Sequence, residues 1–190
     1  MARIIRDHGP CGLRPDRTGS PFEALATAVI HQQLHGKAAR TILGRVIALG
    51  GGRTFPKPGS IPGISDAAFR QAGLSAAKTA AIRDLAAKAL DGTLPSSQAI
   101  RHLAEDEIIE RCTQARGVGR WTVEMLLISR LGRPDVLPID DYGVRNGARI
   151  AYGLAEPPKP KELAILGEPW RPWRSVAAWY LWRVADAAKA

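Results

Sequence analysis

Among the side chains that could do chemistry, two adjacent carboxylates come first. Asp140 and Asp141 lie between Pro138 and a helical pattern that begins at Tyr142. Aspartate is favoured at helix N-termini, so one of the two is expected to cap the helix. A cap needs only one carboxylate, and a negative charge at the positive end of a helix can also stabilise a cationic reacting centre. The pair therefore indicates either a cap alone or a group that stabilises a cation, such as a sugar oxocarbenium ion.

A second candidate is the segment Gly117-Val118-Gly119, which separates two helical patterns. Glycine permits positive φ, and without side chains its backbone N–H groups can face a phosphate. The helix that follows would point its N-terminal dipole at the same anion, and Val118 would anchor the turn in the core. The segment indicates a phosphate-binding helix–hairpin–helix turn, with an ordinary turn between helices as the alternative.

The tryptophans are unevenly distributed along the chain. One follows the hairpin and four crowd the C-terminal part: Trp121, Trp170, Trp173, Trp179 and Trp182. Indole rings pack in cores, and they also stack on nucleobases and attract cationic rings. Core packing accounts for most of them, but a tryptophan-lined pocket beside a carboxylate would suit a positively charged base.

The elements that must position these groups are helices. Residues 21–33 place Phe22, Leu25, Ala26 and Val29 at helical spacing, and residues 36–49 repeat the pattern before three glycines end it. Serines mark the start of further helices at positions 65 and 75. Because no useful alternation of period two occurs, we predict an all-α fold with about nine or ten helices.

Composition limits the function classes. The chain has 190 residues with 27 Lys and Arg against 18 Asp and Glu, a net charge of +9. This excess favours a nucleic-acid partner, with a solubilising surface charge as the alternative. Two cysteines cannot supply the four thiolates of an iron–sulfur cluster. No apolar run approaches the roughly 20 residues needed to cross a bilayer, and no secretory signal is visible. We expect a cytoplasmic, monomeric protein with no membrane partner and a single domain over residues 1–190.

Four motifs together resemble a known superfamily. FEALATAVIHQQ, RGVGRWTVEMLLIS, LPIDDYGVRNG and EPWRPWRSVAAWYLW occur in the order found in the helix–hairpin–helix/Gly-Pro-Asp (HhH-GPD) DNA glycosylases. Within this superfamily the chain looks most like the bacterial 3-methyladenine DNA glycosylases II, and the similarity covers about residues 20–185. The resemblance implies a compact, two-lobed helical fold without the N-terminal β-domain of some members, and an active-site cleft between the lobes.

The resemblance also implies residue roles for base excision. The essential aspartate matches Asp141, with Asp140 as the alternative. The base pocket is expected to include Trp121, Tyr142, Trp182 and Met125, where Met125 and Arg183 replace aromatic residues common in the family.

For DNA binding, the resemblance points to the hairpin and to the loop after the first long helix. The hairpin, part of a motif over about residues 105–132, would bind a phosphate through Gly117, Val118, Gly119 and Arg120, with a K⁺ or Na⁺ ion held by the backbone near Gly117 and Gly119. Gln33 matches the side chain that fills the gap left by the flipped base. Gln32 and Leu34 are the adjacent alternatives, and His31 and His35 flank them with roles left open.

The reaction expected from this resemblance is hydrolysis without strand cleavage. Bifunctional members carry a Schiff-base lysine where this chain has Trp121, and an indole cannot form that adduct. The resemblance therefore predicts a monofunctional glycosylase that flips alkylated purines out of double-stranded DNA and needs no cofactor. The alternatives are a glycosylase for deaminated or mismatched bases and a non-catalytic DNA-binding module.

Overall fold

The computed structural model describes residues 1–188, and these form helices with no strand. The all-α prediction is confirmed. The chain divides into two compact units, one made of Thr18–Leu126 and the other of Met1–Arg17 together with Leu127–Ala190. We call them the central unit and the terminal unit. None of the described helices is long and apolar enough to cross a membrane.

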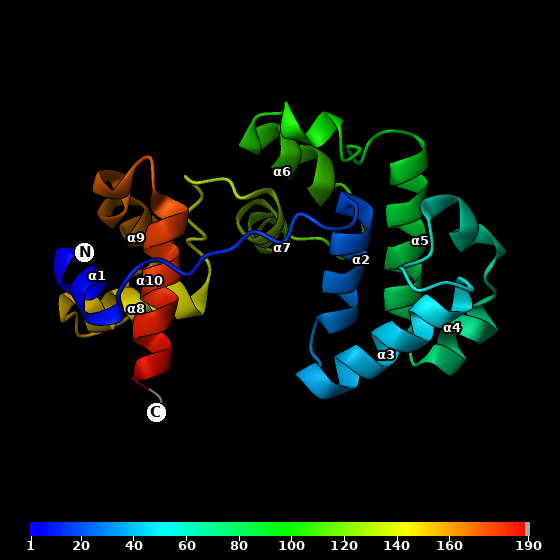
Figure 1. Ribbon diagram of the computed structural model, residues 1–190, viewed down its shortest axis with the longest axis horizontal. Helices are drawn as coiled ribbons and strands as arrows, with labels where there is room; N and C mark the ends of the chain where they lie inside the picture. The colour runs from blue at the N-terminus through cyan, green and yellow to red at the C-terminus, as the bar shows by residue number, and fades with distance from the viewer. Residues whose placement is uncertain (189–190) are drawn as a thin grey trace. The chain divides into compact units, whose positions relative to one another are not determined.

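The central unit contains six α-helices and two short 3₁₀ helices (Figure 1). Their bounds are α2 Pro21–His31, α3 Gly36–Leu49, η1 Pro58–Gly63, α4 Asp66–Ala72, α5 Ala76–Leu90, η2 Ala99–Arg101, α6 Glu105–Thr113 and α7 Arg120–Leu126. Helix α2 packs against α3, α5 and α7. The predicted apolar stripe of α2 is confirmed, because Phe22, Leu25, Ala26 and Val29 are all buried.

Local sequence explains where several of these helices begin. Ser20, Ser65 and Ser75 each cap a helix, and their hydroxyl oxygens accept backbone N–H bonds at 3.1, 3.2 and 3.3 Å. The turn between α4 and α5 uses Gly73, whose φ of 103° is costly for other residues. The first turn of α5 lies beside the C-terminal end of α2, where Lys78 donates to the carbonyls of Ile30 and Gln32.

The terminal unit is built around two packed helices, α8 and α10 (Figure 1). Its elements are α1 Ala2–His8, the π-helical turn η3 Leu127–Leu131, α8 Tyr142–Tyr152, α9 Pro160–Leu166, η4 Glu168–Trp170 and α10 Arg174–Ala187. The sequence predicts one continuous helix after the hairpin, but the winding widens at η3. Arg133 N–H donates to the Leu127 carbonyl at 2.9 Å, and Gly132 with φ 67° ends the turn.

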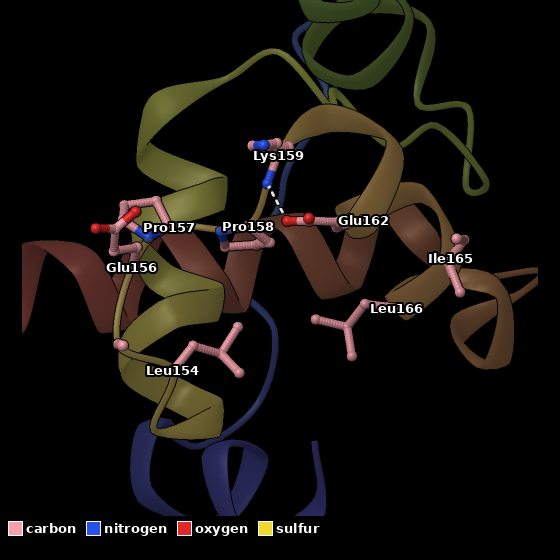
Figure 2. A pocket seen from close by; sticks show the side chains of 9 residues that line it. Leu154, Glu156, Pro157, Pro158, Lys159, Glu162, Ile165 and Leu166 are labelled. Atoms are coloured by element: carbon pink, nitrogen blue, oxygen red, sulfur yellow. Dashed lines mark hydrogen bonds between the residues drawn. The ribbon is translucent and has the colours of Figure 1, made fainter.

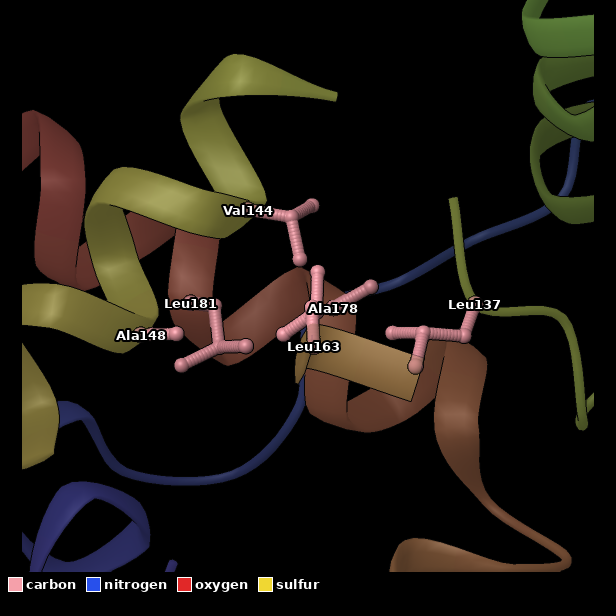
Figure 3. Close-up of a cluster of buried hydrophobic side chains, with 6 residues drawn as sticks. All are labelled: Leu137, Val144, Ala148, Leu163, Ala178 and Leu181. Atoms are coloured by element: carbon pink, nitrogen blue, oxygen red, sulfur yellow. The ribbon is translucent and has the colours of Figure 1, made fainter. Parts of the chain in front are cut away.

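The core of the terminal unit depends on a close helix crossing. Figure 3 shows Val144 and Ala148 of α8 pointing toward Ala178 and Leu181 of α10, with Leu137 and Leu163 completing the buried cluster. A Cβ atom at Gly147 would lie within 3 Å of the Leu181 backbone, so only glycine permits this approach. The crossing places the start of α8 next to the indole of Trp182.

The N-terminal segment completes the same unit. Tyr180 of α10 donates its hydroxyl hydrogen to the Gly9 carbonyl at 2.8 Å, and the Asp16 N–H donates to the Ser129 carbonyl at 2.9 Å. A Cβ atom at Gly12 would lie 3.1 Å from the Trp179 ring. Residues from both ends of the described chain therefore share one core.

Candidate active site and nucleic-acid-binding surface

Asp141 is the N-cap of α8, and its carboxylate is held by two donors. Asp141 Oδ1 accepts the Val144 N–H and the Trp182 Nε1–H, both at 2.9 Å. The cap bond comes from the helix itself, whereas the indole bond comes from α10, 41 residues further along the chain. The structure thus brings together two of the residues predicted for the site. The two donors hold Asp141 Oδ1 at the positive end of the helix dipole.

The other carboxylate of the pair lies in a different environment. Asp140 is exposed and precedes the cap, while Asp141 is half-buried. The backbone between Pro138 and Asp141 makes a turn, in which the Asp141 N–H donates to the Pro138 carbonyl at 3.1 Å. The geometry therefore favours Asp141 over Asp140 as the group held for a task. Tyr142, the first residue of α8, directly follows the cap and is 67% exposed.

A residue that the sequence analysis missed makes the Asp141–Trp182 contact feasible. A Cβ atom at Gly143 would lie 3.0 Å from Trp182 Cδ1 and 3.1 Å from Asp141 Oδ1. Any side chain at position 143 would press against both the indole and the carboxylate, and would force them to move. The signal in the sequence is a glycine in the first turn of a helix. A glycine there lowers helix stability relative to alanine, so its presence indicates that a neighbouring group approaches closely. We call Asp141, Gly143 and Trp182 the carboxylate cluster.

Two of the remaining tryptophans of the terminal unit pack against tyrosine rings, and the third is exposed. Trp170 stacks on Tyr152 at 6.3 Å between ring centroids, and Trp179 meets Tyr180 edge-to-face at 4.9 Å. Trp173 is 59% exposed. Ring packing of this kind agrees with the core role expected for most of the tryptophans, and it accounts for Trp170 and Trp179.

The predicted hairpin joins α6 to α7 in the central unit. Gly117 has φ 76°, and Val118 is buried as the sequence predicts. The Val118 N–H donates to the Ala115 carbonyl at 3.1 Å, and the Gly119 carbonyl accepts the Thr122 N–H at 3.0 Å, which closes the first turn of α7. The hairpin is therefore a tight turn that leads directly into a helix N-terminus, the geometry expected of a phosphate-binding turn.

Two acidic residues that the sequence analysis missed hold the hairpin and its arginine. Asp84 of α5 accepts the Arg116 N–H at 2.7 Å. Glu124 of α7 is 2% exposed and accepts a hydrogen bond from Arg120 Nε at 2.9 Å, while 55% of the Arg120 side chain is exposed. A buried carboxylate thus orients an exposed guanidinium next to the hairpin. Asp84 is 32 residues from Arg116, a separation at which the sequence gives no signal, whereas Glu124 lies four residues after Arg120, a spacing at which opposite charges pair on a helix.

Trp121 and Met125 lie one turn apart on α7. Trp121 is 46% exposed and Met125 is half-buried, whereas Thr122, Val123 and Leu126 are buried. The two predicted pocket residues therefore share the outer face of the helix.

The loop after α2 carries the expected wedge residues, and we call residues 32–35 the wedge loop. Gln33 and Leu34 are both exposed. Gln33 has φ 57°, the one positive φ of a non-glycine residue in the described part of the chain. Gln32 is not displayed in this way, because its Nε2 donates to the Gly117 carbonyl at 2.9 Å. His31 Nδ1 lies 2.8 Å from the Thr27 carbonyl, and His35 is the N-cap of α3.

No group of three or more His, Cys, Asp and Glu that could hold a metal ion occurs among residues 1–188. An ion at the hairpin would need backbone carbonyl oxygens, and the Gly117 carbonyl already accepts the Gln32 amide hydrogen. The monovalent cation expected there stays a prediction.

Comparisons with known proteins decide the family. Residues 26–172 match the HhH-GPD superfamily of base excision DNA repair proteins. The chain belongs to this superfamily. It is 39% identical over 178 residues to DNA-3-methyladenine glycosylase 1 of Schizosaccharomyces pombe, covering 92% of this chain and 78% of that protein.

Solved structures agree with this assignment. A complex of the Schizosaccharomyces pombe 3-methyladenine glycosylase with abasic DNA matches with a TM-score of 0.85 at 38% identity, covering 100% of this chain and 92% of that chain. A Bacillus halodurans DNA-3-methyladenine glycosidase matches with a TM-score of 0.90 at 35% identity, covering 99% and 85%. The family and helical fold predicted from the sequence motifs are confirmed for this HhH-GPD protein.

One further hollow in the terminal unit contains none of the predicted site residues. It is an open groove of about 560 Å³ lined by Leu154, Pro157, Ile165 and neighbouring side chains. Figure 2 shows these side chains along the groove, together with the bond at 2.7 Å from the Lys159 N–H to Glu162 that starts α9.

Proposed function

We propose that this HhH-GPD protein is a monofunctional DNA glycosylase that hydrolyses the N-glycosidic bond of alkylated purines. The observation that carries the proposal is the Asp141 carboxylate, held at the N-terminus of α8 by Val144 and by the indole of Trp182. A non-catalytic DNA-binding module needs the hairpin, and a helix cap alone needs only the Val144 N–H, not a second donor from α10. The names of the similar proteins from Schizosaccharomyces pombe and Bacillus halodurans support alkylated bases as substrates.

The reaction makes modest demands on the protein. Methylation at N3 or N7 gives the purine a positive charge and makes it a good leaving group, so no strong general acid is required. As the C1′–N bond breaks, the base leaves with the bonding electrons and the sugar becomes an oxocarbenium-like cation. Asp141 would stabilise that charge, and water would add its oxygen to C1′ and release a proton to the solvent, which leaves a hydroxyl group on the sugar. The base must first leave the helical stack, which costs a few kcal/mol and less for weakly paired lesions.

The remaining roles follow from the surfaces described above. The hairpin and Arg120 would hold the DNA backbone without reading sequence, and Gln33 or Leu34 would fill the gap behind the extruded base. Trp121, Met125, Tyr142 and Trp182 would contact the base. Trp121 has no amine that could form a Schiff base, which supports hydrolysis without strand cleavage. We propose that the protein acts as a monomer on double-stranded DNA in the cytoplasm.

The test is the release of free base from alkylator-treated duplex DNA, measured by chromatography for the wild type and two matched variants. We expect Asp141→Asn to lose at least about a hundredfold in single-turnover rate while still binding abasic DNA, because it removes the charge that stabilises the transition state. Asp140→Asn, the exposed neighbour, should stay near the wild-type rate.

Other results would redirect the proposal. A normal rate in Asp141→Asn with a slow Asp140→Asn would move the role to Asp140. Release of hypoxanthine or mismatched thymine in place of methylated purines would change the substrate class. Strand cleavage without added alkali, together with a borohydride-trapped adduct, would contradict the monofunctional reaction.

A further inference from the structure

Lys78 makes contacts that the proposed reaction does not use. It lies in the first turn of α5, and its Nζ donates to two backbone carbonyls at the end of α2, those of Ile30 and Gln32, both at 2.8 Å. Carbonyls at the C-terminal end of a helix have no partner within the helix. An ammonium group has three donors and the charge that suits this end of the helix dipole, so Lys78 can satisfy both carbonyls at once.

Gln32, the residue that follows α2, is therefore held from two sides. Its backbone carbonyl accepts from Lys78, and its side-chain amide donates to the Gly117 carbonyl of the hairpin. The N-terminal end of α5 is itself fixed, because Ser75 caps it. Gln32 thus links three parts of the central unit: the wedge loop, the start of α5 and the hairpin.

Lys78 is half-buried, and burial lowers its pKa from the ordinary value. A lysine that serves only solubility would extend into water, where its ammonium is better solvated. The Lys78 ammonium instead donates to the Gln32 carbonyl, at the start of the wedge loop. Its position is explained by what it holds.

The backbone of Gln33 shows why these contacts to Gln32 matter. Gln33 has a φ of 57°, a conformation that side chains other than glycine rarely adopt and that persists where neighbouring contacts enforce it. Lys78 donates to the carbonyl of the peptide that joins Gln32 to Gln33, and to the Ile30 carbonyl two residues earlier. A preformed loop does not have to be ordered when DNA binds, so its side chain is available as soon as a base leaves the stack.

We infer that Lys78 is a positioning residue for base flipping, which keeps the wedge loop in its inserting shape and, through Gln32, ties that loop to the DNA-binding hairpin. This inference rests on the proposed function, because it takes the wedge role of Gln33 or Leu34 from it. Lys78 acts through the loop and not by touching the damaged nucleotide.

The test compares four lysine variants and two wedge variants. K78M removes the donors and keeps the length of the side chain, K78R restores donors, and K78Q is a milder change if K78M does not fold. K57M is the matched control, since Lys57 is an exposed lysine of the same unit, and its side chain makes no capping hydrogen bond at the start of η1. Q33A and L34A identify the inserting residue.

The primary readout needs no chemistry by the enzyme. A duplex with a tetrahydrofuran abasic site next to 2-aminopurine reports insertion of the wedge by fluorescence. We expect K78M to lower this signal about as much as the responsive wedge variant, K78R to restore it, and K57M to leave it unchanged. K78M should also slow single-turnover release of 7-methylguanine paired with cytosine about tenfold, and have a smaller effect when the opposite base is mispaired.

A double-mutant cycle then separates positioning from an independent effect. If Lys78 acts through the wedge loop, K78M combined with the responsive wedge variant should be no worse than the wedge variant alone. Multiplying effects would overturn the inference. So would a full signal in a folded K78M or K78Q, or a signal that neither Q33A nor L34A lowers. A weaker salt dependence of K78M on undamaged DNA would show a direct phosphate contact and would also overturn it.

The two proposals fail in different ways. A wild-type protein that gives normal insertion fluorescence but releases no base from alkylated DNA would contradict the proposed function and leave the role of Lys78 standing. Base release that is normal in both wild type and K78M would contradict the role of Lys78 alone.

Discussion

The indole of Trp182 has two separable properties, a ring that can stack on a base and an N–H that holds Asp141. Its Nε1 is 2.9 Å from Asp141 Oδ1, so losing the donor should loosen the carboxylate without removing it. A displacement of about 1 Å in a catalytic group can lower a rate by about a hundredfold. We therefore expect Trp182→Phe to lower the single-turnover rate by roughly tenfold to a hundredfold while the affinity for abasic DNA changes little.

Gly143→Ala distinguishes the hydrogen bond from stacking, because it keeps the indole. The new methyl group would lie 3.0 Å from Trp182 Cδ1 and 3.1 Å from Asp141 Oδ1, so the pair must shift. The rate should fall in the same direction as in Trp182→Phe. If Gly143→Ala is fully active and Trp182→Phe is slow, the indole acts by stacking and not by orienting Asp141.

Among the helices, the crossing of α8 and α10 sets the geometry of the carboxylate cluster. Gly147→Ala would place a methyl group against the Leu181 backbone, and overpacking of this kind costs about 1–3 kcal/mol or more. The matched control is Gly44→Ala in α3, where a Cβ atom would meet nothing within 4 Å. There alanine should stabilise by about 0.5–1 kcal/mol. Urea denaturation followed by circular dichroism measures both, and equal effects would contradict the packing explanation.

The start of α10 should make the terminal unit sensitive to acid. Asp135 accepts hydrogen bonds from Arg174 Nε at 2.7 Å and Arg171 at 2.8 Å. Burial acts to raise the pKa of Asp135, but the hydrogen bonds from Arg174 and the charges of both arginines outweigh it and hold the pKa below its ordinary value. The unfolded chain, with the ordinary aspartate pKa of about 3.9, then takes up the proton first.

The sign of the pH effect follows from this order. The stabilisation by Asp135 is fully present above about pH 4 and is lost as the pH falls through the lower, folded value. Asp135→Asn should therefore be less stable than the wild type near neutral pH, and the difference in free energy of unfolding should shrink on acidification. A difference that stays constant with pH would show that Asn disturbs packing and not the ion pair.

For the whole molecule, a net charge of +9 predicts DNA binding that depends strongly on salt. Arg120 is the exposed cation that a buried carboxylate orients beside the hairpin. Arg120→Gln should weaken binding to damaged and undamaged DNA alike and reduce the slope of log K against log salt by about one. The exposed Arg6 of α1 is the matched control, and Arg6→Gln should leave the slope unchanged. Equal slopes in both variants would remove Arg120 from the phosphate contacts.

Across the molecule, local patterns were readable from the sequence and distant partnerships were not. Helix caps such as Ser75, the α2 stripe and the cap at Asp141 depend on residues within a few positions, which spacing reveals. Lys78 with Gln32, Arg116 with Asp84 and Trp182 with Asp141 are 46, 32 and 41 residues apart. Only the folded arrangement of the helices brings them together. The family resemblance supplied the roles of several residues but not these contacts.

The separation of segments in the terminal unit has a consequence for synthesis on the ribosome. The central unit is one uninterrupted stretch, so it can fold as soon as Leu126 has left the exit tunnel. The terminal unit must wait, because Gly9 finds its partner Tyr180 only 171 residues later. During that interval the hairpin is already formed, while Asp141 still lacks the indole that orients it. A nascent chain would therefore form the DNA-binding hairpin well before it completes the carboxylate cluster that hydrolysis of a glycosidic bond requires.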